Sequence, residues 1–218
     1  MPIAPRDPPI VEPPIRLAVC VSGGGTTLQN LIDRIAAGRL HAEVVQVVAN
    51  KPGVGALARS EAAGIPAEVV VRTGRGLSEF SAAIFEPIRR QRADLVILGG
   101  FLALLEIPDD YTGRVINIHP ALIPAFCGQG FHGEAVHRAV IDSGVKVSGC
   151  TVHFADQAYD TGPIILQKVV PVRDDDTPSI LAARVFAAEG AALPEAIELY
   201  AAGRLKVEGR RVLIRSEQ

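Results

Sequence analysis

Asn117 and His119 stand two positions apart at the end of the strand-forming run RVINIH, and Pro120 follows them. Side chains two positions apart on a β-strand face the same way, so both can point at one substrate atom. An asparagine amide can donate a hydrogen bond to a developing oxyanion, and histidine can carry a proton near neutral pH. The pair suits attack on a carbonyl, although the same residues also fit an ordinary strand end.

A catalytic imidazole is usually oriented by a carboxylate, and the segment DQAYDTGP offers two. Asp156 begins this segment. Asp160 precedes a Thr-Gly-Pro turn that can present its side chain rigidly. Either aspartate fits the role, and an aspartate before such a sequence is also a common turn residue.

A glycine-rich turn, SGGGTTLQ at residues 22–29, follows an apolar run and opens a helical pattern. Glycines let backbone amides approach an anion, and a helix N-terminus favours negative charge. The turn lacks both the GxGxxG pattern and the lysine of a P-loop, and Asn50 and Lys51 stand where a ribose-binding acid is expected. This favours a single terminal phosphate over a dinucleotide. The alternative is a tight turn capped by Thr26 or Thr27.

Strands and helices that alternate along the chain position these residues. We expect strands at 16–21, 42–49, 67–71 and 93–100, with helices at 26–37, 55–63 and 77–92. The strands are apolar on both faces, which indicates a parallel sheet covered on both sides, as in a mononucleotide-binding half. In such sheets, ligands bind beyond the carboxyl ends of the strands.

The second half of the chain has a different pattern. We expect a strand at 114–118, a helix at 133–143, two strands at 149–155 and 164–172, a helix at 178–202 and a short hairpin around 205–214. The short connection between the two middle strands indicates antiparallel pairing. The predicted fold class is therefore α/β: a Rossmann-like, mostly parallel sheet with helices on both faces and an antiparallel addition in the C-terminal half.

Composition and charge limit the function classes. The 218 residues are 48% hydrophobic and 21% charged, which indicates a soluble globular protein, and we expect a proline-rich tail at 1–15 and a single domain at 16–218. A net charge of −2 without a basic stripe argues against nucleic acid. No apolar stretch reaches about 18 residues, so we expect no membrane span. Three cysteines without ligand spacing argue against a metal site and fit a reducing cytoplasm.

The run NIHPALIPAF, followed by GCTVHFADQAYDTGPIILQ, resembles the signature of the 10-formyltetrahydrofolate-dependent formyltransferases, and the similarity extends from about Arg16 to about Glu208. The turn SGGGTTLQ and the short length resemble the branch that formylates glycinamide ribonucleotide (GAR) in purine biosynthesis. The resemblance implies the formyltransferase fold, with a phosphate-binding half at 16–113 and a catalytic and folate-binding half at 114–218. The partners it implies are GAR and 10-formyltetrahydrofolate, bound by a cytoplasmic monomer or homodimer.

The same resemblance implies a role for particular residues. Asn117 would bond the formyl oxygen, a protonated His119 would stabilise the same charge and shuttle protons, and Asp160 would raise the pKa of His119. The substrate-binding residues would be Gly25, Thr26 and Thr27 for the phosphate and Glu189 for the glycinamide part. The cofactor-binding residues would be Leu102, Ala103, Leu104, Leu105, Asn117 and Asp156.

Other readings remain open. A formyltetrahydrofolate deformylase, which is a hydrolase, shares the catalytic trio, but it normally carries an N-terminal regulatory domain that the proline-rich tail cannot be. A methionyl-tRNA formyltransferase would need a further tRNA-binding domain and a basic surface. A third possibility is a non-catalytic module that binds phosphate or folate. We expect His132, His137 and His153 to be structural, and we do not expect Cys127 to be a nucleophile.

Overall fold

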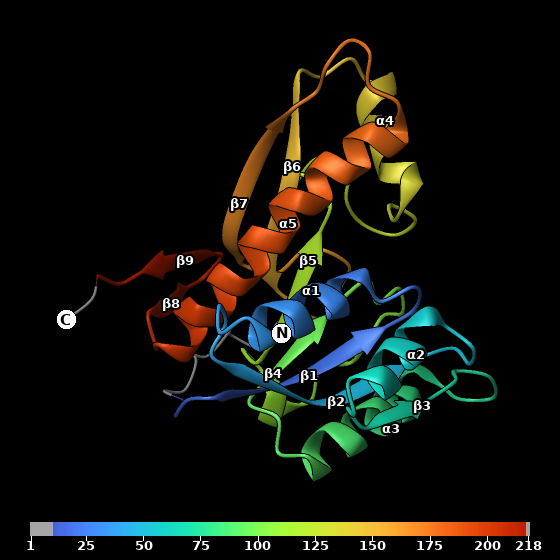
Figure 1. The fold of residues 1–218 in the computed structure, drawn as a ribbon, viewed down its shortest axis with the longest axis vertical. Coiled ribbons are helices and arrows are strands. Elements are labelled where there is room, and N and C mark those ends of the chain that lie inside the picture. The colour runs from blue at the N-terminus through green and yellow to red at the C-terminus, as the bar shows by residue number, and fades with distance from the viewer. Residues whose placement is uncertain (1–10, 217–218) are drawn as a thin grey trace.

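The fold is built on a mixed nine-stranded sheet within residues 11–216, the part of the chain that this computed structural model describes (Figure 1). The strand order is β3-β2-β1-β4-β5-β6-β7-β9-β8. Parallel pairing joins the first five in this order, whose bounds are β1 (Ile15–Val21), β2 (Ala42–Ala49), β3 (Ala67–Val69), β4 (Leu95–Leu98) and β5 (Val115–His119). Antiparallel pairing then joins β5, β6 (Val147–Phe154) and β7 (Ile164–Pro171). A hairpin of β8 (Leu205–Glu208) and β9 (Arg211–Ile214) continues the sheet beyond β7.

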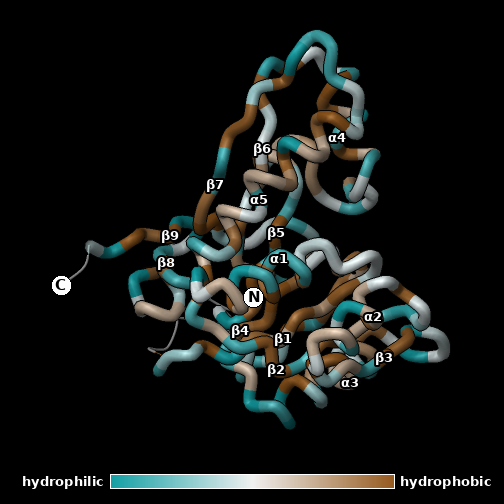
Figure 2. Tube along the Cα trace, in the orientation of Figure 1, coloured by the Kyte–Doolittle hydropathy of each residue, from teal (hydrophilic) through white to brown (hydrophobic). Residues whose placement is uncertain are grey.

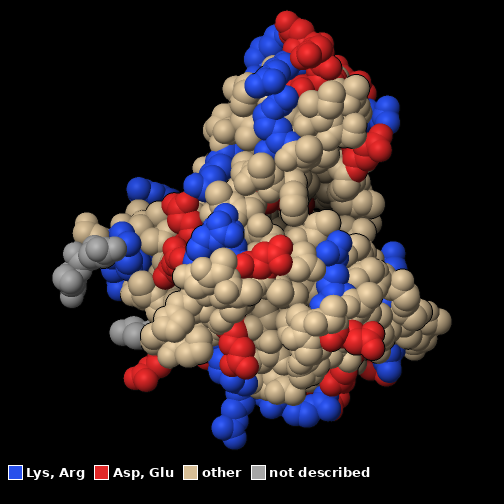
Figure 3. All heavy atoms as spheres, in the orientation of Figure 1, with Lys and Arg blue, Asp and Glu red and all other residues tan. Residues whose placement is uncertain are grey.

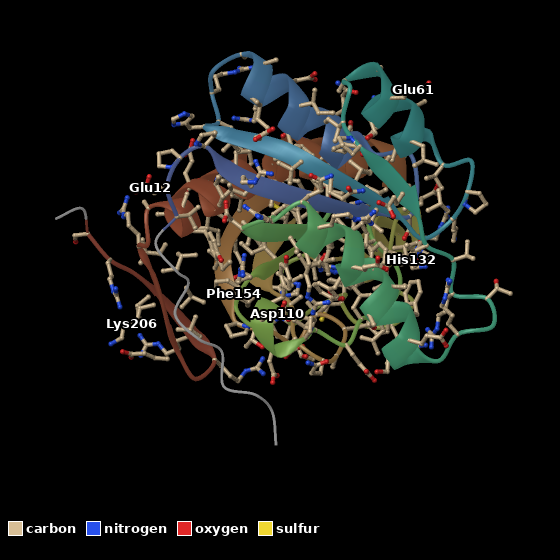
Figure 4. All side chains as sticks on the ribbon, turned by 90° about the horizontal axis from the view of Figure 1, so that it is seen from below. Glu12, Glu61, Asp110, His132, Phe154 and Lys206 are labelled. Atoms are coloured by element: carbon tan, nitrogen blue, oxygen red, sulfur yellow. The ribbon has the colours of Figure 1, made fainter. Side chains whose placement is uncertain are left out.

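Helices cover both faces of this sheet, and each covered face has its own hydrophobic core. The helices are α1 (Thr26–Ala36), α2 (Gly55–Ala62), α3 (Leu77–Arg90), α4 (Glu134–Asp142) and α5 (Pro178–Ala201), with a 3-10 turn at Asp109–Tyr111. Alternate residues of β1 enter opposite cores: Leu17 and Val19 pack with α1 and α5, whereas Ala18 and Cys20 pack with α3. Figure 2 shows the apolar strands at the centre, and Figure 4 shows α1 and α2 on one side of the sheet and α3 on the other.

This architecture confirms the predicted fold class, but several predicted bounds were wrong. The strand predicted at 93–100 is only Leu95–Leu98, because Gly99 and Gly100 already belong to the loop that leaves the sheet. The strand predicted at 67–71 is reduced to three residues at the sheet edge. No helix of the described residues is long and apolar enough to cross a membrane.

The proline-rich tail was predicted to lie outside the fold. Residues 1–10 of that tail are outside the described part of the chain. Val11 is partly buried and packs against the main core, so the prediction was wrong for this residue. Its apolar side chain gains from burial beside the first strand, which begins four residues later.

The sheet brings the predicted chemical residues to one edge. The strand order reverses at β1, which has β2 on one side and β4 on the other, and ligands of open α/β sheets bind where this happens. The turn after β1, the loop after β4 and the end of β5 all lie at the carboxyl ends of parallel strands. The antiparallel neighbour β6 adds His153 to the same edge, directly opposite Asn117.

Candidate active site

A cavity of about 790 Å³ lies at this edge, between the parallel half of the sheet and the part of the molecule that carries α4 and α5. On the face shown in Figure 3, the surface is hollowed below that part, and both signs of charge are spread around it. The cavity is lined by segments far apart in the sequence: the start of α1, the loop 100–102, the end of β5, the loop 128–134, Asp160 and α5. Such a cavity is large enough for a drug-sized ligand.

Asp160 is the polar centre of this site. Its Oδ2 accepts a 2.8 Å hydrogen bond from the backbone N–H of Gly128 and lies 3.6 Å from Nδ1 of His119. Its Oδ1 accepts a 3.2 Å bond from Nδ2 of Asn117. Burial alone would raise the pKa of Asp160, but the contacts with His153, Gly128 and His119 outweigh it and lower the pKa. Asp160 is therefore a carboxylate at neutral pH.

The local chain geometry presents Asp160 in this way. The residue has a φ of 56°, a left-handed conformation that aspartate tolerates better than most residues. Two residues later, a Cβ atom on Gly162 would collide with the carbonyl oxygen of Phe154, so only glycine lets the loop pass this close to β6. This explains the glycine in the DTGP sequence.

His119 is 4% exposed and is held from both sides. Its Nε2 donates to the carbonyl oxygen of Phe126 at 2.8 Å, which leaves Nδ1 facing Asp160. Burial lowers the pKa of His119 by more than the nearby carboxylate and carbonyl raise it. Burial therefore favours the neutral ring in this structure, whereas a protonated His119 was predicted.

The amide nitrogen of Asn117 contacts two other side chains of the protein. Nδ2 donates to Oδ1 of Asp160 and lies 3.0 Å from Nε2 of His153. His153 is 1% exposed, and its other ring nitrogen, Nδ1, donates to the carbonyl oxygen of Phe154 at 2.9 Å. The sequence reading treated His153 as structural and missed this contact. The only signal would have been the antiparallel register of β5 and β6, which no local pattern gives.

The glycine-rich turn has the features of an anion site. Gly25 is the N-cap of α1, with a φ of 74°, and no side chain caps the helix, so neither Thr26 nor Thr27 acts as the predicted cap. The first backbone N–H groups of a helix point outward and carry the positive end of its dipole. Thr26 and Thr27 both line the cavity.

Arg59 is a residue near this turn that the sequence reading missed. It projects from α2, and its Nε donates to the carbonyl oxygen of Gly24 at 2.8 Å, while Nη1 donates to Oε1 of Gln29 at 2.9 Å. The arginine ties α2 to the turn and places a positive charge beside it. Such a charge supports an anion at the helix start.

Glu189 lies on α5 and lines the cavity. Burial raises the pKa of its carboxyl group to about 7. A group with this pKa exists in both ionisation states near neutral pH, which sets it apart from an ordinary solvated helix residue.

Some of the predicted cofactor-binding residues line the cavity, and others do not. Leu102 lines the cavity and is 40% exposed, and its backbone N–H bonds Oγ of Ser22. Leu105 is buried in the core against α3, Ala103 packs against that core, and Leu104 is partly buried away from the cavity lining. Asp156 is not in the cavity lining either, and its Oδ1 accepts hydrogen bonds from the hydroxyl of Thr161 and from the backbone N–H of Ala158.

Three further residues complete the description of the site. His132 and His137 both line the cavity, and Nδ1 of His137 is buried without a hydrogen-bond partner among the described residues. Burial raises the pKa of the Cys127 thiol, which disfavours the thiolate that a nucleophile needs. Within residues 11–216 no cluster of three or more histidine, cysteine or acidic residues has a metal-binding arrangement.

Comparisons with known proteins show which family the chain belongs to. The family profile described as formyl transferase matches residues 15–197. Glycinamide ribonucleotide transformylase 1 from Symbiobacterium toebii has a similar crystal structure, with 40% identity, a TM-score of 0.85 and coverage of 93% of this chain and 94% of that one. Phosphoribosylglycinamide formyltransferase, chloroplastic, from Arabidopsis thaliana is 38% identical over 88% of this chain and 67% of its own length.

Two other relatives differ more from this chain, one in length and the other in sequence. The trifunctional purine biosynthetic protein adenosine-3 from Gallus gallus is 39% identical over 88% of this chain, which spans only 19% of that protein. A formyltetrahydrofolate deformylase from Pseudomonas syringae has a TM-score of 0.82 but 23% identity, and this chain covers 66% of it. That last likeness shows the shared fold alone.

Proposed function

Because the chain belongs to the formyl transferase family, we propose that it transfers the formyl group of 10-formyltetrahydrofolate to the amine of GAR, as a step of purine biosynthesis. The observation that carries this proposal is the convergence of Asn117, His119 and Asp160 on one cavity that also holds an uncapped helix N-terminus. The three side chains suit acyl transfer, and the helix N-terminus suits a phosphate monoester.

In this proposal His119 acts first as a base. A neutral ring with its proton on Nε2 has a free lone pair on Nδ1, which can take the proton that the amine loses as it attacks. Asp160, 3.6 Å away, then stabilises the imidazolium. His119 returns this proton to the folate nitrogen when the carbon–nitrogen bond of the formyl donor breaks, so the ring is neutral again at the end.

Asn117 and His119 together would stabilise the formyl oxygen as it takes on negative charge. Both N–H groups of Asn117 face protein acceptors in this structure. The 3.2 Å bond to Asp160 is at the long end of the normal range, so this is the N–H that the oxyanion can share while the other stays on His153. A charged His119 would favour this sharing, since it draws Asp160 toward itself.

Substrate binding would use the two ends of the cavity. The phosphate of GAR would lie at Gly25, Thr26 and Thr27, and Glu189 would accept hydrogen bonds from the glycinamide part. The folate would lie along the loop of Leu102, where the exposed apolar rim of Leu102, Phe131 and Phe186 fits a flat aromatic ligand. Backbone groups of the 102–105 and 156–160 segments would complete this subsite.

The proposal also covers the division of the domain into two halves, the location of the protein and its oligomeric state. The half at 16–113 would bind the phosphate and the half at 114–218 would carry catalysis and the folate, within a single domain at 16–218. A cytoplasmic location and a monomeric or homodimeric state remain predictions. Two relatives, from Vigna unguiculata and Arabidopsis thaliana, are named as chloroplastic.

The proposal is tested by following folate absorbance with purified protein, 10-formyltetrahydrofolate and GAR. We expect turnover only when GAR is present. Turnover without GAR would support the deformylase, and binding without turnover would support the non-catalytic module. In the same assay, His119→Asn removes the base and is expected to abolish turnover while both substrates still bind, which equilibrium binding would measure. A near wild-type rate in this variant would refute the assigned role.

A further inference from the structure

We propose that His153 is a positioning residue, which holds the amide of Asn117 in one orientation by accepting a hydrogen bond from its Nδ2. The inference rests on the proposed formyl transfer, since the orientation of Asn117 matters through that reaction. His153 would touch no substrate and would act only through its neighbour.

The hydrogen bonds of His153 define which ring nitrogen accepts. Nδ1 lies 2.9 Å from the carbonyl oxygen of Phe154, which can only accept, so Nδ1 carries the proton. In the neutral ring Nε2 then has a lone pair; it faces Nδ2 of Asn117 at 3.0 Å and lies farther, at 3.6 Å, from Oδ1 of Asp160. The tautomer is fixed by a backbone group, a common way to set the role of a histidine.

Asn117 has only one orientation that satisfies this arrangement. Its Nδ2 carries two hydrogens, of which one serves His153 and the other serves Oδ1 of Asp160. Turning the amide over would place its oxygen against the Asp160 carboxylate and against the lone pair of His153. Both contacts would be repulsive, so the two neighbours together reject the flipped amide.

The sheet explains why these side chains meet. Asn117 on β5 and His153 on β6 are direct partners in the antiparallel register, and such partners have neighbouring side chains on the same face. Both ring nitrogens of His153 have partners, and the side chain is 1% exposed. The ring is therefore fixed in place and cannot follow Asn117 if the amide moves.

Variants can separate this role from a general structural one. Leucine at position 153 removes the acceptor, whereas the longer side chain of glutamine can place Oε1 where Nε2 stood. We expect His153→Leu to lower kcat on the order of 10- to 100-fold, because small misplacements of a catalytic group have effects of this size. KM for both substrates should stay within about threefold. His153→Gln should recover most of kcat, and the exposed His41→Leu serves as the matched control with unchanged rate.

A double-mutant cycle tests whether the effect passes through Asn117. If His153 acts only through this amide, adding His153→Leu to Asn117→Ala causes no further loss of kcat. An additional loss equal to that of the single variant would overturn the proposal. Should His153→Leu not fold, His153→Asn replaces it, since asparagine can still reach the backbone of Phe154 but not Asn117.

A spectroscopic measurement keeps the proposal testable apart from activity. The chain has three asparagines, Asn30, Asn50 and Asn117, so ¹⁵N-asparagine labelling gives three side-chain amide signals. The Asn117 signal should shift and broaden in His153→Leu and return toward its original position in His153→Gln. An unchanged signal would overturn the proposal. Failure of the wild-type protein to use GAR would refute the proposed function alone, because the amide signal does not depend on turnover.

Discussion

Replacing Asp160 with asparagine tests how the site stabilises a charged His119. The substitution keeps the shape of the side chain and an oxygen that can accept the N–H of Gly128, but it removes the negative charge. The side chains of Asp160 and His119 are 10% and 5% exposed, so water screens their interaction weakly. The variant also removes one of the two acceptors: with the asparagine oxygen on Gly128, the new amide nitrogen faces Nδ2 of Asn117, which donates to Oδ1 in the wild-type protein.

The size of the effect follows from the separation of the two groups. An imidazolium and a carboxylate 3.6 Å apart attract by roughly 4 to 5 kcal/mol at an effective dielectric constant of about 20. The asparagine dipole keeps part of this attraction, so we expect a loss of about 3 kcal/mol in transition-state stabilisation, or roughly 10²-fold in kcat. KM should change little, because the charge on His119 develops only during the reaction.

The pH dependence of kcat gives a second readout of the same variant. The neutral form of His119 is the base, and its pKa lies below the ordinary value, so the acid limb of the wild-type profile should fall below pH 6.5. The Asp160 charge raises that pKa, so Asp160→Asn should move the limb to still lower pH. The control is Asp174→Asn, which makes the same charge change at an exposed pair with Lys146. A kcat within threefold of wild type, or a limb that moves to higher pH, would refute the reasoning.

Three further predictions concern other parts of the molecule. Gly25→Ala should lower the free energy of unfolding by about 2 kcal/mol or more, because the residue has a φ of 74° and its new Cβ would meet Ala56 at 2.7 Å. It should also weaken phosphate binding; denaturant titration measures the first effect and calorimetry the second. Gly24→Ala, with open space around it, is the control. Glu189→Gln should raise KM for GAR roughly tenfold, and it should abolish the fall in wild-type KM as pH rises through the carboxyl pKa of about 7; a KM that still changes with pH would contradict this. Contacts with Arg184 lower the pKa of Asp176 to about 2, so the stability it contributes is present above its ordinary pKa of 3.8 and is lost as pH falls toward 2; acid unfolding of Asp176→Asn should lack this component, and identical acid unfolding curves would exclude it.

Local patterns were sufficient to predict most of the fold and the identity of the central residues. Apolar runs that alternate with helical periodicity define the parallel half, because each element carries its own pattern. Asn117 and His119 could be located because a strand end and a spacing of two residues are both local features. The carboxylate needed more, since Asp156 and Asp160 share one loop. The family resemblance selected Asp160, and the fold shows that this is the aspartate that approaches His119.

The features that sequence reading missed depend on contacts between distant segments. His153 joins the site through the register of β5 and β6, and Arg59 reaches the glycine turn from another helix. The direction of the His119 pKa shift was also out of reach, because it depends on burial in the folded protein. Leu105 shows the converse: its place in the folate segment did not reveal that it points into the core.

The most direct test of the central claim is to trace the formyl carbon. Protein is incubated with GAR and 10-formyltetrahydrofolate that carries ¹³C in the formyl group, and the products are analysed by mass spectrometry. Formyl transfer predicts one labelled formyl group on the GAR amine for each tetrahydrofolate released, with no labelled formate. Labelled formate with unmodified GAR would contradict the account.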